Sequence, residues 1–147
     1  MHNNNNNNKR IILIEDNIDD AELTIFAFKK SYPEIEILHL NNGVEALDFI
    51  FNAANIDYMK SVSLILLDIN MPMVNGLQVL QRLKTSNTTK YIPVVMLTSS
   101  LEEKDLEESY NLGANSYLKK PVSFENFLNT VKLLENYWLR INELPLY

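Results

Sequence analysis

The chain has 147 residues, with 13 lysines and arginines against 19 aspartates and glutamates, which gives a formal net charge of −6. This acidic balance disfavours a nucleic-acid partner, because nucleic-acid binders use lysine and arginine to neutralise phosphates. The absence of cysteine excludes disulfides, thiolate catalysis and cysteine-ligated zinc. Neither a secretory leader nor a membrane-spanning apolar run is present in the sequence, so we expect a cytoplasmic protein without a membrane partner.

Composition divides the chain into a polar tail and one domain. Residues 3–8 are six consecutive asparagines, and a tract that buries no apolar surface is typical of disorder. We therefore predict a disordered tail over residues 1–8. Residues 9–147 are predicted to form a single domain, because a chain of this length can build one hydrophobic core without cross-links.

From residue 10 onward, short apolar runs alternate with helical patterns. Strands are predicted at residues 10–14, 35–40, 64–68, 94–98 and 116–118, and helices at 19–31, 44–51, 75–85, 101–112 and after Ser123. Asp19 is predicted to cap the first helix together with Glu22, and residues 52–63 are predicted to be a long polar connection. Strands that alternate with helices form a parallel sheet with helices on both faces, so the predicted fold class is α/β and doubly wound.

Chemically active side chains follow four of the five predicted strands. Glu15 and Asp16 follow the first strand, Asp68 ends the third, Thr98 ends the fourth and Lys120 follows the fifth. We expect these side chains to converge, because open parallel sheets bind ligands beyond the carboxyl ends of their strands. Three adjacent carboxylates repel one another unless a cation joins them, and oxygen ligands favour Mg²⁺ or Ca²⁺. With Mg²⁺ beside it, Asp68 would be a nucleophile toward a phosphoryl group.

In combination, these motifs resemble the receiver domain of two-component signalling, the CheY-like family. The motifs are Glu15-Asp16, the run Leu66 to Pro72 followed by Gly76, Thr98-Ser99 and Lys120-Pro121. The spacings match as well, with 30 residues from Asp68 to Thr98 and 22 from Thr98 to Lys120. The resemblance spans about residues 9–136 and implies a flavodoxin-like sheet of five parallel strands in the order 2-1-3-4-5, with five helices.

The resemblance also implies the phosphoacceptor and the metal ligands. Asp68 corresponds to the aspartate that receives a phosphoryl group from a histidine kinase. Glu15, Asp16 and Asp68, with the backbone carbonyl of Asn70, correspond to the Mg²⁺ ligands. The protein is then expected to catalyse only its own phosphorylation and dephosphorylation, and not to act as an enzyme on other substrates.

A switch is implied by the same resemblance. Thr98 and Lys120 correspond to the two groups that sense the phosphoryl oxygens, and Tyr117 corresponds to the aromatic residue that turns inward on activation. The helix at residues 101–112, the strand at 116–118 and the last helix would then form the signalling surface. Output is expected through protein–protein contacts, because no further domain fits after this one.

Two departures from the family pattern point to a subgroup. Glu15 replaces the more common aspartate in the acidic pair, and Asp16 and Asp68 are 52 residues apart, several more than in the minimal chemotaxis form. The longer connection, with Tyr137-Trp138-Leu139 and Pro145 near the end, resembles single-domain regulators of cyanobacterial-type phytochrome kinases. This likeness implies a phytochrome-type histidine kinase as the partner.

The last helix predicts a homodimer. At 100° per residue, Trp138 and Ile141 continue the apolar face that meets the core, while Leu133, Tyr137 and Leu144 fall nearly opposite. An apolar stripe on the outer side of a helix marks an interface. We therefore predict that these three residues join the signalling surface in a dimer; the alternative is a frayed end that folds back on its own domain.

Other functions fit the sequence less well. A phosphatase of the haloacid dehalogenase type needs a second acid two residues after its nucleophile, where this chain has Asn70. A flavodoxin-type FMN site would meet repulsion from Glu15 and Asp16. Two alternatives remain open: a receiver-like interaction module that works without phosphorylation, and an intermediate in a phosphorelay.

Overall fold

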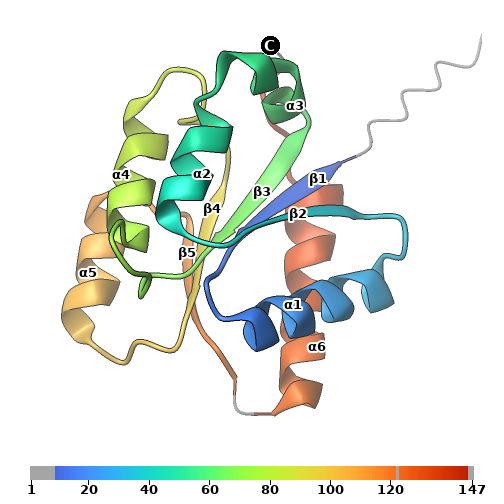
Figure 1. Ribbon diagram of the computed structural model, residues 1–147. Helices are drawn as coiled ribbons and strands as arrows, with labels where there is room; N and C mark the ends of the chain where they lie inside the picture. The colour runs from blue at the N-terminus through green and yellow to red at the C-terminus, as the bar shows by residue number, and fades with distance from the viewer. Residues whose placement is uncertain (1–8, 122, 146–147) are drawn as a thin grey trace, which may run out of the picture.

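A five-stranded parallel sheet is the centre of the computed structural model, which describes residues 9–121 and 123–145 (Figure 1). The strands are β1 (Arg10–Ile14), β2 (Glu36–Leu40), β3 (Val62–Leu67), β4 (Val94–Thr98) and β5 (Ser116–Lys119). Their order is β2-β1-β3-β4-β5, which confirms the predicted fold class and topology. The tail predicted for residues 1–8 lies outside the described residues.

Helices cover both faces of the sheet, as expected for right-handed crossovers between parallel strands. They are α1 (Ile18–Ser31), α2 (Gly43–Ile50), α3 (Ile56–Lys60), α4 (Gly76–Thr85), α5 (Glu103–Asn111) and α6 (Phe124–Leu134). Helices α1 and α6 pack together on one face, while α2, α4 and α5 lie on the other (Figure 1). The structure therefore has one α-helix more than predicted.

Burial on both faces explains why the central strands are almost entirely apolar, with Ser63 of β3 as a buried polar exception. All six residues of β3 are buried, as are the last four of β1. Ile12 and Ile14 pack beneath α2 and α4, whereas Ile11 and Leu13 face α1 and α6. Successive side chains of a strand point to opposite faces, so a strand enclosed on both sides has few positions for polar side chains until it ends.

Helix α1 begins earlier than predicted. Asn17 is its N-cap, and the Asn17 side chain accepts a hydrogen bond from the backbone N–H of Asp20 at 3.0 Å. Asp19, the predicted cap, lies instead inside the first turn. The earlier start places Asp20 in the first helical turn directly after the end of β1.

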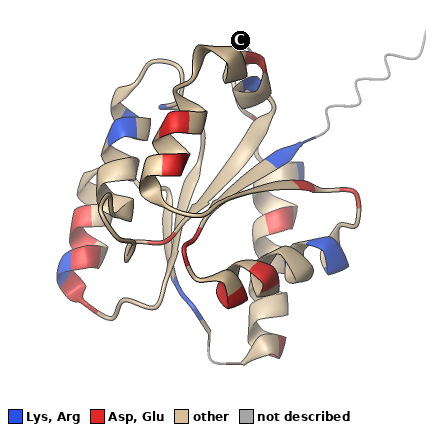
Figure 2. Ribbon diagram, viewed as in Figure 1, with Lys and Arg blue, Asp and Glu red and all other residues tan. Residues whose placement is uncertain are grey.

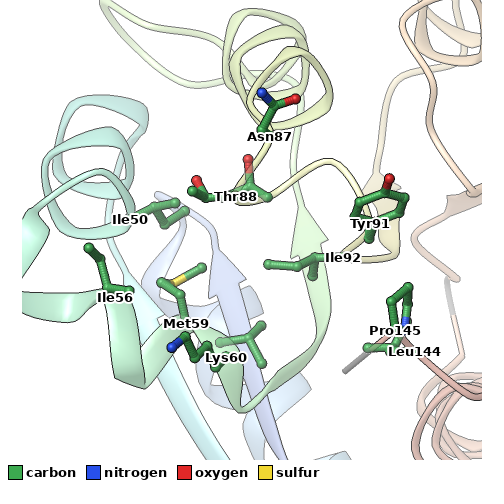
Figure 3. Close-up of a pocket in the computed structure, with 12 residues that line it drawn as sticks. Ile50, Ile56, Met59, Lys60, Asn87, Thr88, Tyr91, Ile92, Leu144 and Pro145 are labelled. Atoms are coloured by element: carbon green, nitrogen blue, oxygen red, sulfur yellow. The ribbon is translucent and has the colours of Figure 1, made fainter. Parts of the chain in front are cut away.

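The connection predicted for residues 52–63 contains the additional helix. A 3₁₀ turn (Ala53–Asn55) leads into α3, where Met59 is buried and the Tyr58 ring meets Phe49 edge-on at 5.3 Å between centroids. Residues of α3, the loop before β4 and the C-terminal segment enclose an apolar pocket of about 310 Å³ (Figure 3). It lies at the amino-terminal edge of the sheet, opposite the strand ends that carry the predicted site.

The last helix changes its geometry after α6. It continues as a π-helix (Glu135–Ile141), whose larger turn breaks the 100° periodicity on which the predicted core face depends. As a result Leu139 is buried, while Ile141 is 60% exposed, contrary to the prediction. The helix ends at Ile141, and the backbone of the next residue, Asn142, is extended. Leu144 therefore does not continue the stripe of Leu133 and Tyr137; it is half-buried and lines the apolar pocket.

The π-helix is attached to the rest of the domain by a buried charge. Glu135 is 5% exposed, and its carboxylate accepts a hydrogen bond from the Arg140 guanidinium at 2.6 Å and one from Ser31 at 3.4 Å. Among the described residues, none of the helices combines the length and the apolar composition that crossing a bilayer requires.

Candidate functional site

The predicted acidic cluster is present at the carboxyl edge of the sheet. Carboxylate oxygens of Glu15, Asp16 and Asp68 all lie within 4.8 Å of one another. The parallel pairing of β1 and β3, with Ile14 opposite Leu67, brings the residues that follow the two strands together. Figure 2 shows these acidic positions in red where β1 and β3 end. Glu15 and Asp68 are buried, at 3% and 6% exposure, whereas Asp16 is open to solvent.

Lys120 reaches into this cluster from the end of β5. Its Nζ donates hydrogen bonds to Glu15 Oε1, to Asp20 Oδ2 at 2.8 Å and to Asp68 Oδ2 at 3.4 Å. The backbone is held as well, because the N–H of Lys120 donates to the Thr98 carbonyl at 2.8 Å. The structure thus brings the predicted lysine and two of the predicted carboxylates into contact.

Asp20 is a site residue that the sequence reasoning missed. Its carboxylate pairs with Lys120 at 2.8 Å across 100 residues of sequence. The signal was the position of an acid in the first turn of the helix that follows the strand-end acids. With Asp19 as the predicted cap, Asp20 would be the first residue of the helix; the Asn17 cap makes it the third residue, where it meets Lys120.

Burial and the neighbouring charges shift the pKa values of Glu15 and Lys120. Burial raises the pKa of Glu15 to about 8, and the adjacent Asp68 carboxylate adds to this effect, while the hydrogen bond from Lys120 opposes it. Burial alone would lower the pKa of the Lys120 ammonium, but its bonds to Asp20 and Glu15 and the charge of Asp68 raise it above its ordinary value. The lysine is therefore cationic at every physiological pH.

A divalent cation fits this donor set. Glu15 Oε2 is buried and has no hydrogen-bond partner among the described residues, which is unusual for a buried carboxylate oxygen. The unpartnered atom belongs to the cluster it shares with Asp16 and Asp68, where only oxygen ligands are offered. Hard oxygen ligands with an excess of negative charge are the environment that Mg²⁺ prefers.

The loop after β3 binds one oxygen of Asp68, and the other oxygen faces Lys120. Asp68 Oδ1 accepts the backbone N–H of Ile69 at 2.8 Å, while Oδ2 faces Lys120. Asn70 follows in the same loop and is exposed. Gly76 closes the loop, since its N–H donates to the Ile69 carbonyl at 2.8 Å. The two oxygens of Asp68 therefore have different partners, the backbone of the loop and the ammonium of Lys120.

Thr98 and Tyr117 meet at a third residue, Ser100. Thr98 is fully buried at the end of β4, and its hydroxyl accepts the backbone N–H of Ser100 at 3.2 Å. The Tyr117 hydroxyl donates to the Ser100 carbonyl at 3.4 Å. Burial raises the pKa of Tyr117. The two predicted switch residues are therefore joined through the loop that leads into α5.

His39 of β2 lies beside the acidic cluster. Its Nε2 is 2.7 Å from the backbone carbonyl of Glu15, at the edge strand β2. The backbone N–H of Glu15 donates to the Leu40 carbonyl at 3.1 Å, so the neighbouring strand holds this residue on both sides. An imidazole at a strand end gives no sequence signal for such a contact.

Comparison with known proteins agrees with this geometry. The family model of the response regulator receiver domain matches residues 11–132. A probable methanogenesis regulatory protein of Methanothrix harundinacea, FilR2, is 38% identical over 92% of this chain and 86% of its own length. The response regulator Rcp1 of Synechocystis is 35% identical over 92% of both chains.

Solved structures show the same relationship. The structure of the phosphorylated cyanobacterial phytochrome response regulator RcpA superposes with a TM-score of 0.85, at 35% identity over 93% of this chain and 98% of that chain. The Mn²⁺-bound form of Rcp1 superposes with a TM-score of 0.82, over 93% and 99%. Receiver domains hold Mg²⁺ at their acidic pocket, and the cluster described above fits that cofactor. The chain belongs to the receiver domain family and is a response regulator of two-component signalling.

Proposed function

We propose that Asp68 is the phosphoacceptor of this response regulator. The observation that supports the proposal is the position of Asp68, which shares one cluster with two further acids while its Oδ2 accepts a hydrogen bond from Lys120. In the reaction, Asp68 Oδ2 forms a bond to phosphorus as the bond from phosphorus to a kinase histidine nitrogen breaks. The product is an acyl phosphate, and the leaving imidazole keeps the electron pair.

The other site residues have complementary roles in this proposal. Glu15, Asp16 and Asp68, with the Asn70 carbonyl, would hold Mg²⁺, which neutralises charge on the phosphoryl oxygens when it is bound. The Lys120 ammonium would move away from the carboxylates and donate a hydrogen bond to a phosphoryl oxygen. The proposed activity is limited to the domain's own phosphorylation and dephosphorylation.

A switch follows from the contacts of Ser100. If the Thr98 hydroxyl turns toward the phosphoryl group, the Ser100 N–H loses the acceptor that it has at 3.2 Å. The Tyr117 hydroxyl contacts the carbonyl of the same residue, so both groups bear on the loop before α5. We expect phosphorylation to rearrange this loop and the surface of α5, β5 and α6, which is a common form of switching.

Incubation with acetyl phosphate and Mg²⁺, followed by intact mass spectrometry, tests the phosphoacceptor. Wild type should gain one phosphoryl group, and Asp68→Asn should gain none because the amide is not a nucleophile. Asp57→Asn, which removes an exposed acid in α3, should react like wild type. Absence of an adduct with acetyl phosphate and with a phosphorylated kinase would favour the phosphorylation-independent interaction module. Onward transfer to a histidine phosphotransfer protein would identify a phosphorelay intermediate.

The kinase is proposed to be of the phytochrome type. RcpA is described as a cyanobacterial phytochrome response regulator, and the chain superposes on it over 93% of its length. We infer that residues 9–147 act as one receiver domain in the cytoplasm, where they would meet such a kinase.

We also propose a homodimer through the outer side of the C-terminal helix and the surface of α5, β5 and α6. Leu133 is 72% exposed and Tyr137 is 49% exposed, although both are apolar or aromatic. The Tyr137 ring is supported by Trp138, edge-on at 4.8 Å between centroids. Leu144 is not part of this proposal. It lines the apolar pocket of its own domain, which favours the alternative that the end of the chain folds back, for this residue alone.

Mass in solution, measured by light scattering, tests the dimer. Wild type should have twice the monomer mass at micromolar concentration, and Tyr137→Glu should shift to the monomer because a charge would be buried in the interface. Asn136→Glu, the same change of charge at the neighbouring exposed position, should remain a dimer. A monomer for wild type, with or without phosphorylation, would contradict the proposal.

A further inference from the structure

Lys120 has more carboxylate partners than its proposed role requires. An ammonium group has three N–H donors, and here they are directed to Glu15, Asp20 and Asp68. Two of these acids belong to the cluster that fits a metal ion. Asp20 is the only one of the three that does not.

This difference matters once Glu15 and Asp68 hold a cation. Their oxygens then face a divalent positive charge, and the neighbouring ammonium is repelled from the position it occupies in the free protein. Lys120 needs another anionic partner close by. Asp20 Oδ2 is already 2.8 Å from Nζ, and its side chain is 41% exposed, so it can follow the ammonium outward.

We propose that Asp20 is a positioning residue that retains Lys120 while the metal cluster is filled, and that it thereby raises the affinity for Mg²⁺. The proposal rests on the assignment of Glu15 and Asp68 as metal ligands. Without Asp20, the ammonium keeps only the two carboxylates that the cation also needs, and the two positive charges compete for the same oxygens.

The local structure supports this role for Asp20 and not for its neighbour. The Asn17 cap fixes the first turn of α1, where the helix dipole favours a negative charge. A small cavity adjoins the ion pair, and its lining includes Asp20 and Lys120 beside mostly apolar side chains, so the pair is not closely packed on that side. Asp19 is exposed in the same turn and forms no ion pair with any described residue.

Titration calorimetry with Mg²⁺, and Mn²⁺ binding followed by electron paramagnetic resonance, test the proposal on the unphosphorylated protein. Asp20→Asn should bind either ion about three- to tenfold more weakly, the effect expected from losing one partly exposed ion pair. Asp19→Asn removes the same charge from the same turn and should bind like wild type. Asp20→Glu should restore most of the affinity. Unchanged affinity in Asp20→Asn would overturn the proposal.

A double-mutant cycle separates positioning of Lys120 from simple attraction between Asp20 and the metal. In a Lys120→Met background, Asp20→Asn should no longer weaken binding, because the residue on which Asp20 acts is absent. An equal loss in both backgrounds would also overturn the proposal. Thermal unfolding should show that every variant is folded. If wild type binds Mg²⁺ but accepts no phosphoryl group, the phosphoacceptor assignment fails, while the cycle still decides the role of Asp20.

Discussion

Alanine in place of Gly76 is expected to destabilise the protein by about 3 kcal/mol or more. A Cβ atom at this position would lie 2.0 Å from the carbonyl oxygen of Asp68 and 2.8 Å from the Cα of Ile69. Both are backbone atoms at the end of β3, the central strand, and cannot rotate away. The gain in helix propensity, about 1 kcal/mol at most, is too small to offset the clash. Urea unfolding measures the change.

The same substitution is expected to impair phosphorylation more than the loss of stability explains. Relief of the clash must move the carbonyl of Asp68, and with it the carboxylate that is fixed by the Ile69 N–H at 2.8 Å. We therefore expect acetyl phosphate to modify the folded fraction of Gly76→Ala much more slowly than wild type. Intact mass spectrometry at a temperature where the variant is fully folded measures this rate.

Gly113→Ala is the matched control for this effect. Gly113 has a φ of +100°, so alanine is strained there, but the nearest atoms to its Cβ would be side-chain carbons of Lys84, at 3.2 Å or more, and no backbone atom of the site. A cost of about 1–2 kcal/mol is expected, without an effect on phosphorylation. If the free energy of unfolding of Gly76→Ala were within about 1 kcal/mol of the wild-type value, the backbone at the end of β3 would be able to move at little cost, contrary to this prediction.

The sheet and the acidic cluster could be predicted because each rests on a strong local signal. A strand enclosed on both faces is apolar along most of its length, so a charged residue after the apolar run marks its end, as Glu15 and Asp68 do. The carboxyl ends of neighbouring parallel strands meet at one edge, which joins residues that are 53 positions apart in sequence. Residue type and topology were sufficient to bring Lys120 to the same edge.

Two features could not be predicted from the sequence, the contact of Asp20 with Lys120 and the packing of the last helix. Both depend on the geometry at the end of a helix. Asn17, Asp19 and Asp20 are all acceptable near a helix start, and only the observed cap decides which acid points to Lys120. The pattern at 100° per residue assumed a regular α-helix, and the π-helix moved Leu139 into the core. Its turn brings Glu135 and Arg140, five residues apart, into contact at 2.6 Å. Such a pairing has no distinct sequence signature.

The free energy of unfolding of the metal-free protein is expected to fall as the pH rises from about 5 to about 8. Burial and the Asp68 carboxylate raise the pKa of Glu15 to about 8 in the folded state, against 4.5 for the ordinary group. Between these values the folded protein retains a proton that the unfolded chain has lost. Because the folded state binds more protons, its stability decreases with rising pH, by at most about 1.4 kcal/mol per pH unit.

This dependence of stability on pH has a defined window, and the cofactor should remove it. Lys120 contributes nothing to it, since its raised pKa affects stability only above the ordinary lysine range. About one pH unit above the raised pKa of Glu15 the loss is complete, and we expect it to total about 2–4 kcal/mol. A ligating carboxylate must be ionised, so saturating Mg²⁺ should flatten the pH dependence, and the apparent Mg²⁺ affinity should increase with pH up to about 8. Chemical unfolding in EDTA and in Mg²⁺ measures both effects.

Glu15→Gln isolates the residue responsible. The amide has nearly the same shape but no charge, so the metal-free variant should be more stable than wild type at pH 8, and its stability should not fall between pH 5 and 8. It should also lose most of the stabilisation by Mg²⁺, because a charged ligand has been removed. Glu22→Gln, at an exposed position of α1, should behave like wild type in both respects. If Glu15→Gln were less stable than wild type at pH 8 without metal, the ion pair with Lys120 would outweigh the burial of the carboxylate, and Glu15 would be a structural anchor in the resting protein.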